Sequence, residues 1–287
     1  MSVDLLNVPS TLTKRILAGP LRLVTLCSDD IDEIRSFYVD HMGLSLDGPL
    51  DVEEPEKLKT YFGITEGIEM AIYQVGPKYA DDGIFFRIIN ISQSTPKIKG
   101  SASAREVGLL MMERQSGAKD QLSQSPNHFY WSNLTSSVSE EPTPTVTLVT
   151  DQLEEDIVFY THIFGMNLIA EETREMAKKE LPGLDRHTII RSVRLQSKTG
   201  EGCYIQLIAY DDEEYNELQA APRLPNQGIV MCSYETTDIG EILARAHAKQ
   251  IKIYRTPRKL NDPLLGEVIT MSLLSPTGSI VEVYSRA

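Results

Sequence analysis

Residues Leu23 to Leu46 read LVTLCSDDIDEIRSFYVDHMGLSL, and residues Thr145 to Leu168 read TVTLVTDQLEEDIVFYTHIFGMNL. The two stretches align without a gap and share nine identities, where average composition would give about one or two. Each opens with Val-Thr-Leu, carries Phe-Tyr near the end of a helical pattern, and continues to a glycine. The chain therefore contains one supersecondary unit that is used at least twice.

The sequence around the first stretch predicts the elements of this unit. A β-rich alternation over Leu21 to Cys27 predicts a strand. Apolar residues then recur at three- and four-residue intervals from Ile31 to Met42, which predicts a helix that ends at Gly43. Three extended stretches follow, so the order is β-α-β-β-β: Leu44 to Leu46, Ile68 to Val75, and Ile84 to Ile91.

The second stretch predicts the same order, and a third, more divergent copy follows it. Between the first and second copies, two strand-like segments, Glu106 to Met112 and Phe129 to Trp131, lack a convincing helix, so a fourth unit is expected to be reduced. The predicted elements of the second copy are Val146 to Val149, a helix at Leu153 to Phe164, a strand near Leu168, Thr188 to Leu195 and Cys203 to Ala209. Those of the third copy are Gly228 to Tyr234, a helix at Ile239 to Ala248, Ile251 to Tyr254, Val268 to Leu274 and Ile280 to Tyr284.

Length and composition suit two domains. A chain of 287 residues with 41% hydrophobic content can give each half its own core. The segment Ser132 to Pro144, rich in Ser, Thr, Glu and Pro, is the expected linker. We therefore predict an N-terminal domain at 20–135, whose second unit is reduced, and a C-terminal domain at 143–287.

Charge and hydropathy limit the partners. A formal net charge of -13 repels phosphate backbones and anionic lipid headgroups, so neither nucleic acid nor a membrane is an expected partner. No apolar run is long enough to span a bilayer, and residues 1–20 lack the pattern of a secretory signal, so we expect a cytoplasmic protein. Three cysteines, Cys27, Cys203 and Cys232, lie in apolar strand-like segments and are expected to be buried thiols.

The duplicated unit, together with the closing segment SPTGSIVE at Ser275 to Glu282, resembles the vicinal oxygen chelate superfamily. That superfamily includes glyoxalases, bleomycin-resistance proteins and extradiol ring-cleaving dioxygenases. The resemblance implies an α+β fold in which the β-α-β-β-β units are paired into two domains, each with a curled mixed sheet around a cavity. It does not by itself imply one activity, because this scaffold supports many chemistries.

The resemblance also implies where a metal would be bound. In the family, ligands come from the first and last strands of the units. These positions correspond here to Leu23, Thr145 and Met231 in first strands, and to Arg87, Gln206 and Glu282 in last strands. Only Glu282 is a suitable ligand, whereas an open catalytic metal site usually has about three protein ligands. We therefore expect neither a family-type metal centre nor another cofactor.

Strand alternation predicts the lining of the expected C-terminal cavity, because residues two apart share a face. The helix-facing set is aliphatic and comprises Val146, Leu148, Ile205, Leu207, Val281 and Val283. The inward set mixes polar and apolar side chains: Thr145, Thr147, Val149, Tyr204, Gln206, Ile208, Met231, Ser233, Glu235, Ile280, Glu282 and Tyr284. A packed interior needs no such polar lining, so a ligand or ordered water is expected in the cavity.

The chemistry of the side chains in this lining indicates their candidate roles. Glu282, enclosed by apolar neighbours, is the candidate general base, and Tyr284 and Gln206 complete the candidate catalytic set. The candidate substrate-binding residues are Thr145, Thr147, Tyr204, Met231, Ser233 and His187, the one histidine of this half expected to reach inward. The alternative for Glu282 is a structural carboxylate that is hydrogen-bonded by its neighbours.

Two further features remain open at this stage. In the N-terminal half, Arg87 can pair with a ligand carboxylate or with an internal acid. The charged segments Glu171 to Arg186 and Arg255 to Gly266 interrupt the predicted strands and are candidate lids or ordinary surface loops.

Three functions are compatible with the sequence. The first is a metal-independent isomerase, epimerase or lyase that acts by proton transfer, with Glu282 as base, on a small, partly apolar oxygenated molecule. The second is a protein that binds or sequesters such a molecule, as bleomycin-resistance proteins do. The third is a metal-dependent glyoxalase or ring-cleavage dioxygenase with atypical ligands. The expected partner is a small molecule, and a homodimer is possible.

Overall fold

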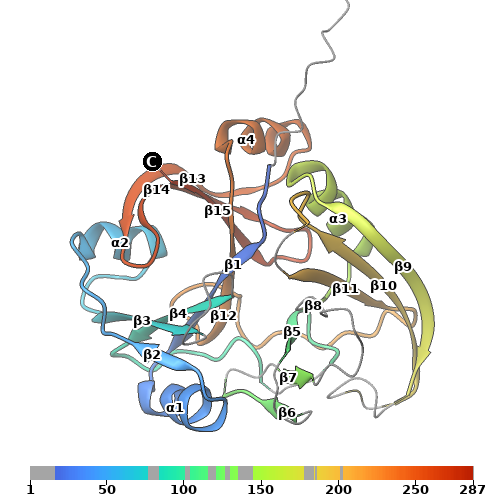
Figure 1. The fold of residues 1–287 in the computed structure, drawn as a ribbon, viewed down its shortest axis with the longest axis horizontal. Coiled ribbons are helices and arrows are strands. Elements are labelled where there is room, and N and C mark those ends of the chain that lie inside the picture. Colours follow the sequence, from blue (N-terminus) through green and yellow to red (C-terminus); the bar gives the residue numbers. More distant parts are fainter. Residues whose placement is uncertain are drawn as a thin grey trace, which may run out of the picture.

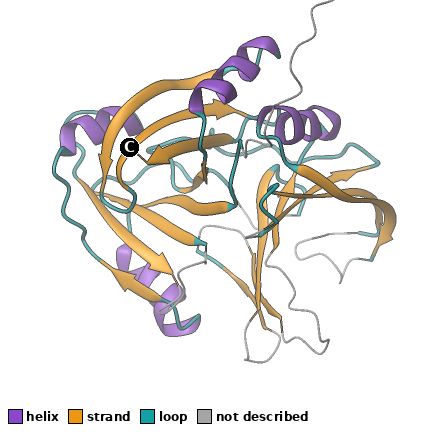
Figure 2. Ribbon diagram, turned by 45° about the horizontal axis from the view of Figure 1, so that its top comes forward, coloured by secondary structure: helices purple, strands orange, loops and turns teal. Residues whose placement is uncertain are grey.

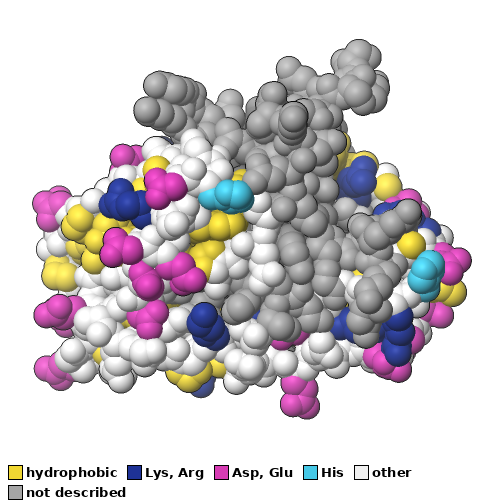
Figure 3. All heavy atoms as spheres, turned by 90° about the horizontal axis from the view of Figure 1, so that it is seen from below, with side chains coloured by type: hydrophobic (Ala, Val, Ile, Leu, Met, Phe, Trp, Pro, Cys, Tyr) yellow, Lys and Arg dark blue, Asp and Glu magenta, His cyan; other side chains and the backbone are white. Residues whose placement is uncertain are grey.

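Two curled, open β-sheets lie side by side, with short helices on their outer faces (Figures 1 and 2). The computed structural model describes residues 17–76, 84–100, 104–115, 121–126, 130–134, 145–177, 184, 186–200 and 203–286. The expected α+β class with curled mixed sheets is confirmed. None of the described helices is long and apolar enough to cross a membrane. Acidic side chains are spread over the left part of the face in Figure 3.

The first sheet combines strands from the two ends of the chain. Its order is β13-β14-β15-β12-β1-β4-β3-β2, and β1 pairs with β12 in antiparallel register at its centre. We call it the eight-stranded sheet. Its strands are β1 (Leu21–Ser28), β2 (Ser45–Asp47), β3 (Met70–Gly76), β4 (Phe85–Ile91), β12 (Gly228–Glu235), β13 (Ile253–Asp262), β14 (Gly266–Leu274) and β15 (Ile280–Arg286).

The second sheet is built from the middle of the chain. Its order is β6-β7-β5-β8-β11-β10-β9, and β5 pairs with β8 in antiparallel register. We call it the seven-stranded sheet. Its strands are β5 (Gly108–Gln115), β6 (Gln121–Gln124), β7 (Tyr130–Leu134), β8 (Thr145–Val149), β9 (Asn167–Met176), β10 (Thr188–Gln196) and β11 (Tyr204–Tyr210).

The pairing of units differs from the expected one. The predicted halves, 20–135 and 143–287, assume that units adjacent in the chain share a sheet. Instead, the first unit joins the last one through β1 and β12, and the two middle units join through β5 and β8. Consecutive units are often adjacent in space, but that is a tendency only. As a result, the predicted C-terminal cavity lining is divided between two sheets.

The two similar stretches fold in the same way. Each has a strand, a short α-helix, a π-helical turn and a second strand. In the first stretch α1 (Ile31–Arg35) continues as η1 (Ser36–His41), and in the second α3 (Leu153–Val158) continues as η2 (Phe159–Ile163). The Phe-Tyr pairs therefore lie in the π-helical turns. Gly43 and Gly165 follow these turns, both with φ +69, a conformation that favours glycine.

The outer faces of the sheets form the main core with these helices and with α4 (Ile239–Ala248). The predicted strand alternation is confirmed here, because every residue assigned to the helix-facing set belongs to this core. Those residues are Val146, Leu148, Ile205, Leu207, Val281 and Val283. The three cysteines are buried thiols, as expected.

One helix and two long strands were not predicted. Helix α2 (Pro55–Phe62) lies at the open side of the curled eight-stranded sheet, between β13-β14 and β3 (Figure 1). Residues 255–262 of the segment Arg255 to Gly266, a candidate lid or surface loop, belong to β13, which forms a hairpin with β14. Likewise, 171–176 belongs to the long edge strand β9, whereas 178–183 and 185 lie outside the described residues.

We expect Asp30→Ala to lower the free energy of unfolding by about 1 kcal/mol, because it removes the cap of α1. The Asp30 carboxylate accepts hydrogen bonds from the backbone amides of Asp32 and Glu33 at 3.0 and 2.9 Å. The exposed neighbour Asp29 is the control, and Asp29→Ala is expected to change stability by less than about 0.5 kcal/mol. Urea denaturation of both variants checks this, and equal effects would contradict the capping role.

Candidate functional site

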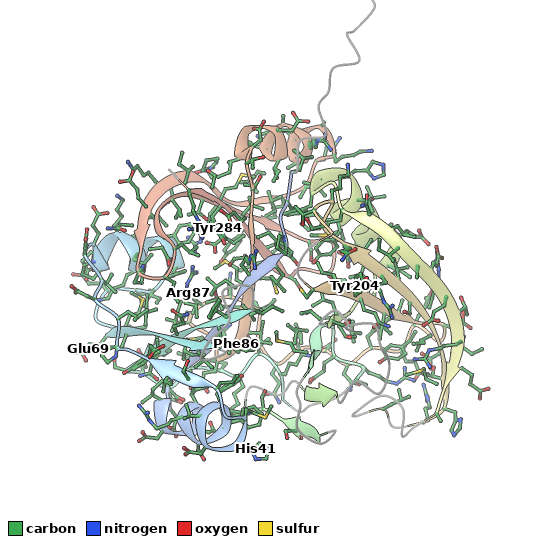
Figure 4. All side chains as sticks on the ribbon, viewed as in Figure 1. His41, Glu69, Phe86, Arg87, Tyr204 and Tyr284 are labelled. Carbon is green, nitrogen blue, oxygen red and sulfur yellow. The ribbon has the colours of Figure 1, made fainter. Side chains whose placement is uncertain are left out.

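The hollow of the eight-stranded sheet contains a buried ion cluster centred on Arg87. Strand β4 places this fully buried guanidinium on the concave face, and Figure 4 shows it inside the curl. Its Nη2 atom lies 2.9 Å from Asp262 Oδ2, and its Nη1 atom lies 3.6 Å from Glu282 Oε2. Burial alone would lower the pKa of Arg87, but Asp262 and then Glu282 hold it above its ordinary value. The arginine therefore stays charged.

Glu282 accepts hydrogen bonds from three hydroxyls in addition to facing Arg87. Tyr61 Oη and Ser233 Oγ each donate at 2.6 Å, to Oε1 and Oε2 respectively. Thr270 Oγ1 donates to Oε1 at 3.1 Å. Each of these contacts stabilises a carboxylate anion. Both oxygens of Glu282 are thus occupied by protein groups, as in the structural alternative.

Helix α2 covers this cluster. Its last turn places Tyr61 against Glu282 and Phe62 against Arg87, whose guanidinium carbon lies 5.5 Å from the Phe62 ring centre. Burial and then Glu282 raise the pKa of Tyr61 well above its ordinary value, so the phenol remains a donor. A second core made of residues from α2, β12, β14 and β15 packs around the cluster. The hollow of the eight-stranded sheet is thereby occupied by side chains.

The hollow of the seven-stranded sheet has a polar centre. Thr147 is fully buried on β8, and among the described residues its hydroxyl has no hydrogen-bond partner. Gln206 lies beside it in the parallel register of β8 and β11, is half-buried, and donates from Nε2 to Ser192 Oγ at 2.9 Å. These three side chains place an amide and two hydroxyls together on the concave face.

The two ends of this polar centre differ in character. At one end Arg194 is exposed, and its guanidinium carbon lies 5.4 Å from the ring centre of Tyr204. At the other end a small apolar cluster includes Val149, Ile190 and Ile208. This face therefore changes from cationic and polar to apolar along its strands.

The predicted site residues are accordingly separated into two groups. Met231, Ser233, Glu282 and Tyr284 lie in the eight-stranded sheet, whereas Thr145, Thr147, Tyr204 and Gln206 lie in the seven-stranded sheet. Figure 4 shows Tyr284 and Arg87 in one half of the molecule and Tyr204 in the other. The expectation of a single cavity that combines Glu282 with Gln206 is thus not met.

His187 belongs to neither hollow. Its side chain is 67% exposed at the outer edge of β9 and β10, with Nδ1 3.6 Å from Glu175 Oε1. It immediately precedes β10, as predicted, but it does not reach inward.

Several residues that build the eight-stranded hollow escaped the sequence interpretation. Asp262 was assigned to a loop, and Tyr61 lies on the unpredicted helix α2. The sequence signal for α2 was present: Pro55 begins it and Gly63, with φ +70, ends it. Leu58, Tyr61 and Phe62 between them are spaced as one apolar helical face.

The donor set does not fit a divalent metal at the positions that the resemblance implies. In the eight-stranded sheet these positions hold Leu23, Arg87, Met231 and Glu282, and the Arg87 guanidinium already faces the one carboxylate. In the seven-stranded sheet they include Thr145 and Gln206, which are weak ligands. Throughout the described residues, no cluster of three His, Cys, Asp or Glu side chains is arranged to hold a metal ion.

Comparison with known proteins identifies the fold family. Residues 144–269 match the model of the Glyoxalase/Bleomycin resistance protein/Dioxygenase superfamily. This segment belongs to that superfamily. The resemblance expected from the sequence is therefore confirmed, and the superfamily match spans the elements from β8 to β14.

Solved structures resemble the fold of more than nine-tenths of the chain. Glyoxalase I from Zea mays aligns with a TM-score of 0.60 and 15% identity, covering 93% of this chain and 92% of the maize chain. A structure described as "putative dioxygenase from Bacillus subtilis subsp. subtilis str. 168" aligns with a TM-score of 0.55 and 12% identity, covering 94% and 86%. No curated protein sequence matches the chain. At these identities the similarity shows the fold alone.

Proposed function

We propose that this chain binds a small oxygenated organic acid on the concave face of the seven-stranded sheet. The observation that carries the proposal is the buried Thr147 hydroxyl, which has no hydrogen-bond partner in the part of the chain that the structure describes and lies beside the half-buried Gln206 amide. A buried hydroxyl without a partner costs about 1 to 3 kcal/mol. A ligand oxygen that accepts from Thr147 would recover that free energy.

The ligand class follows from the two ends of the face. The exposed guanidinium of Arg194 suits a carboxylate, and the neighbouring Tyr204 ring offers a flat contact surface. The apolar cluster at Val149, Ile190 and Ile208 suits a hydrocarbon or aryl group. An aryl carboxylate has both features in one small molecule.

Binding is proposed in preference to proton transfer by Glu282. A general base must reach the proton that it removes. Glu282 accepts hydrogen bonds from three hydroxyls and faces Arg87 below α2. Its contacts are those of a structural carboxylate, so the geometry supports recognition of a ligand in the other hollow.

Benzoate, phenylacetate and 4-hydroxybenzoate are the test ligands, with binding followed by titration calorimetry and by the fluorescence of Trp131, the single tryptophan, on β7. We expect saturable binding of at least one acid to the wild-type chain. Thr147→Val and Gln206→Leu are each expected to weaken it about tenfold, which corresponds to one lost hydrogen bond of about 1.4 kcal/mol.

The matched control is Ser272→Ala in the eight-stranded sheet. Ser272 is another fully buried residue whose hydroxyl has no partner within the described ranges, and it lies opposite Glu282 in the strand register. This variant is expected to bind with unchanged affinity. Loss of binding in Ser272→Ala but not in Thr147→Val would overturn the proposed location, and failure of all three acids to bind would overturn the ligand class.

A further inference from the structure

An apolar cleft lies at the seam between the two sheets. Its walls come from β5 and β8 of the seven-stranded sheet and from β12 and β15 of the eight-stranded sheet. The space between these walls is about 670 Å³, including solvent at the mouth. Its lining is mainly aliphatic, with Leu109, Leu148, Val230 and Ile280 among the residues. Such a lining favours an apolar ligand.

Lys99 is the one lysine among the described residues that line this cleft. It lies in the segment that leads from β4 to β5, next to Ile98, whose backbone is hydrogen-bonded to Gln227. Lys99 is 7% exposed, and Nζ donates to the carbonyl oxygen of Glu106 at 3.2 Å. An ammonium group has three donors. Within the described part of the chain this is the single hydrogen bond made by Nζ, which leaves a buried cation poorly solvated.

Poor solvation favours the neutral amine. Burial lowers the pKa of Lys99 from 10.5 to about 8, and the nearby Glu106 opposes this shift only in part. A change of this size raises the neutral fraction at pH 7 by roughly 300-fold relative to an ordinary lysine. A neutral amine is the nucleophilic form of lysine.

The other titratable side chains on the cleft are not nucleophilic at neutral pH. Burial raises the pKa of Cys232 to about 12, and it raises the pKa of Tyr160 well above its ordinary value. Both therefore remain protonated at neutral pH. The hydroxyl of Ser279 also lines the cleft and can donate a hydrogen bond to a carbonyl oxygen.

We propose that Lys99 captures small apolar aldehydes in this cleft as an imine. The lone pair of the neutral Nζ attacks the carbonyl carbon, so that a C–N bond forms and the carbonyl π electrons move to oxygen. Two protons transfer from nitrogen to that oxygen, which leaves as water, and a C=N bond remains. The step is a condensation in which nothing is oxidised or reduced. The site is separate from the proposed acid-binding face and does not depend on it.

Reductive trapping with benzaldehyde and sodium cyanoborohydride at pH 7 tests the proposal. Hydride from the cyanoborohydride reduces the imine to a stable benzylamine, and peptide mass spectrometry locates it. We expect labelling of Lys99 to saturate with benzaldehyde and to be at least tenfold faster than labelling of Lys97, the exposed lysine two residues away. The rate at Lys99 is expected to rise through pH 8 and then level off.

Two variants and one control complete the test. Lys99→Met and Lys99→Arg are both expected to abolish the fast labelling, while Lys97→Met leaves it unchanged. If neither Lys99 variant folds, the distribution of label over the lysines and the pH profile of labelling in the wild-type chain still test the proposal. Label spread evenly over exposed lysines would overturn the proposal, as would a rate at Lys99 that keeps rising to pH 10.

Discussion

Replacing Arg87 with methionine is expected to lower the free energy of unfolding by about 3 to 5 kcal/mol. The substitution leaves two buried carboxylates, Asp262 and Glu282, without the cation that faces both of them. Methionine preserves much of the contact with Phe62, so lost packing contributes little. Removing one partner of a buried ion cluster costs far more than the net value of the pair, because the remaining charge stays desolvated. Urea denaturation at pH 7 measures the effect.

Arg286 provides the matched control. Its Nε lies 3.2 Å from Glu235 Oε1, at the far end of the same strands, but its side chain is 67% exposed. Solvent screens such a pair, so Arg286→Met is expected to cost less than about 1 kcal/mol. The triple variant Arg87→Met, Asp262→Asn, Glu282→Gln is expected to recover part of the loss, since it removes all three buried charges. A cost for Arg87→Met no larger than that for Arg286→Met would refute the structural role of the cluster.

The same cluster shows what the sequence could and could not predict. Strand alternation placed Arg87 and Glu282 on inward faces, because the two-residue period is a local property of a strand. Pairing with an internal acid was one of the two roles open for Arg87. Their proximity was not predicted, since it depends on β1 pairing with β12 across more than half of the chain. That choice is a non-local one, and the repeated units carry no local signal for it.

The candidate ligand site depends less on that non-local choice. Thr145, Thr147, Tyr204 and Gln206 come from adjacent strands of one unit, β8 and β11, so the sequence placed them together and the structure does the same. Ser192 on β10 was outside the predicted lining, although it lies opposite Ile208 in the strand register. Neighbours within a unit follow from its order of elements, whereas neighbours between units do not.

Lys99 illustrates a second limit. It lies in a connecting segment, where neither helical nor strand periodicity assigns a face. Its burial results from the approach of the two sheets, which form the walls of the cleft from strands distant in the chain. A lysine in a connection is ordinarily exposed, so composition alone gives no reason to single it out.

Asp156→Asn is expected to stabilise the folded chain at pH 7 by up to about 3 kcal/mol. Burial raises the pKa of Asp156 from 3.8 to about 6, although hydrogen bonds from Thr150 and Thr277 oppose the shift. Both hydroxyls donate to Oδ2, at 2.6 and 3.0 Å. Between pH 3.8 and 6 the folded chain retains a proton that the unfolded chain has released, so stability falls as pH rises through this window.

Asparagine keeps an acceptor oxygen for both hydroxyls but cannot ionise, so the gain of Asp156→Asn is expected at pH 7 and is expected to vanish near pH 4. Glu155→Gln, at the exposed neighbouring position of α3, is the control and is expected to change stability by less than about 0.5 kcal/mol at either pH. Urea denaturation at pH 4 and pH 7 separates the effect of the buried charge from that of the hydrogen bonds. An equal loss of stability at both pH values would show that the hydrogen bonds outweigh the buried charge. Asp156 lies on α3 and Thr277 lies in the turn between β14 and β15. The buried Asp156 carboxylate therefore lies at a contact between the two sheets.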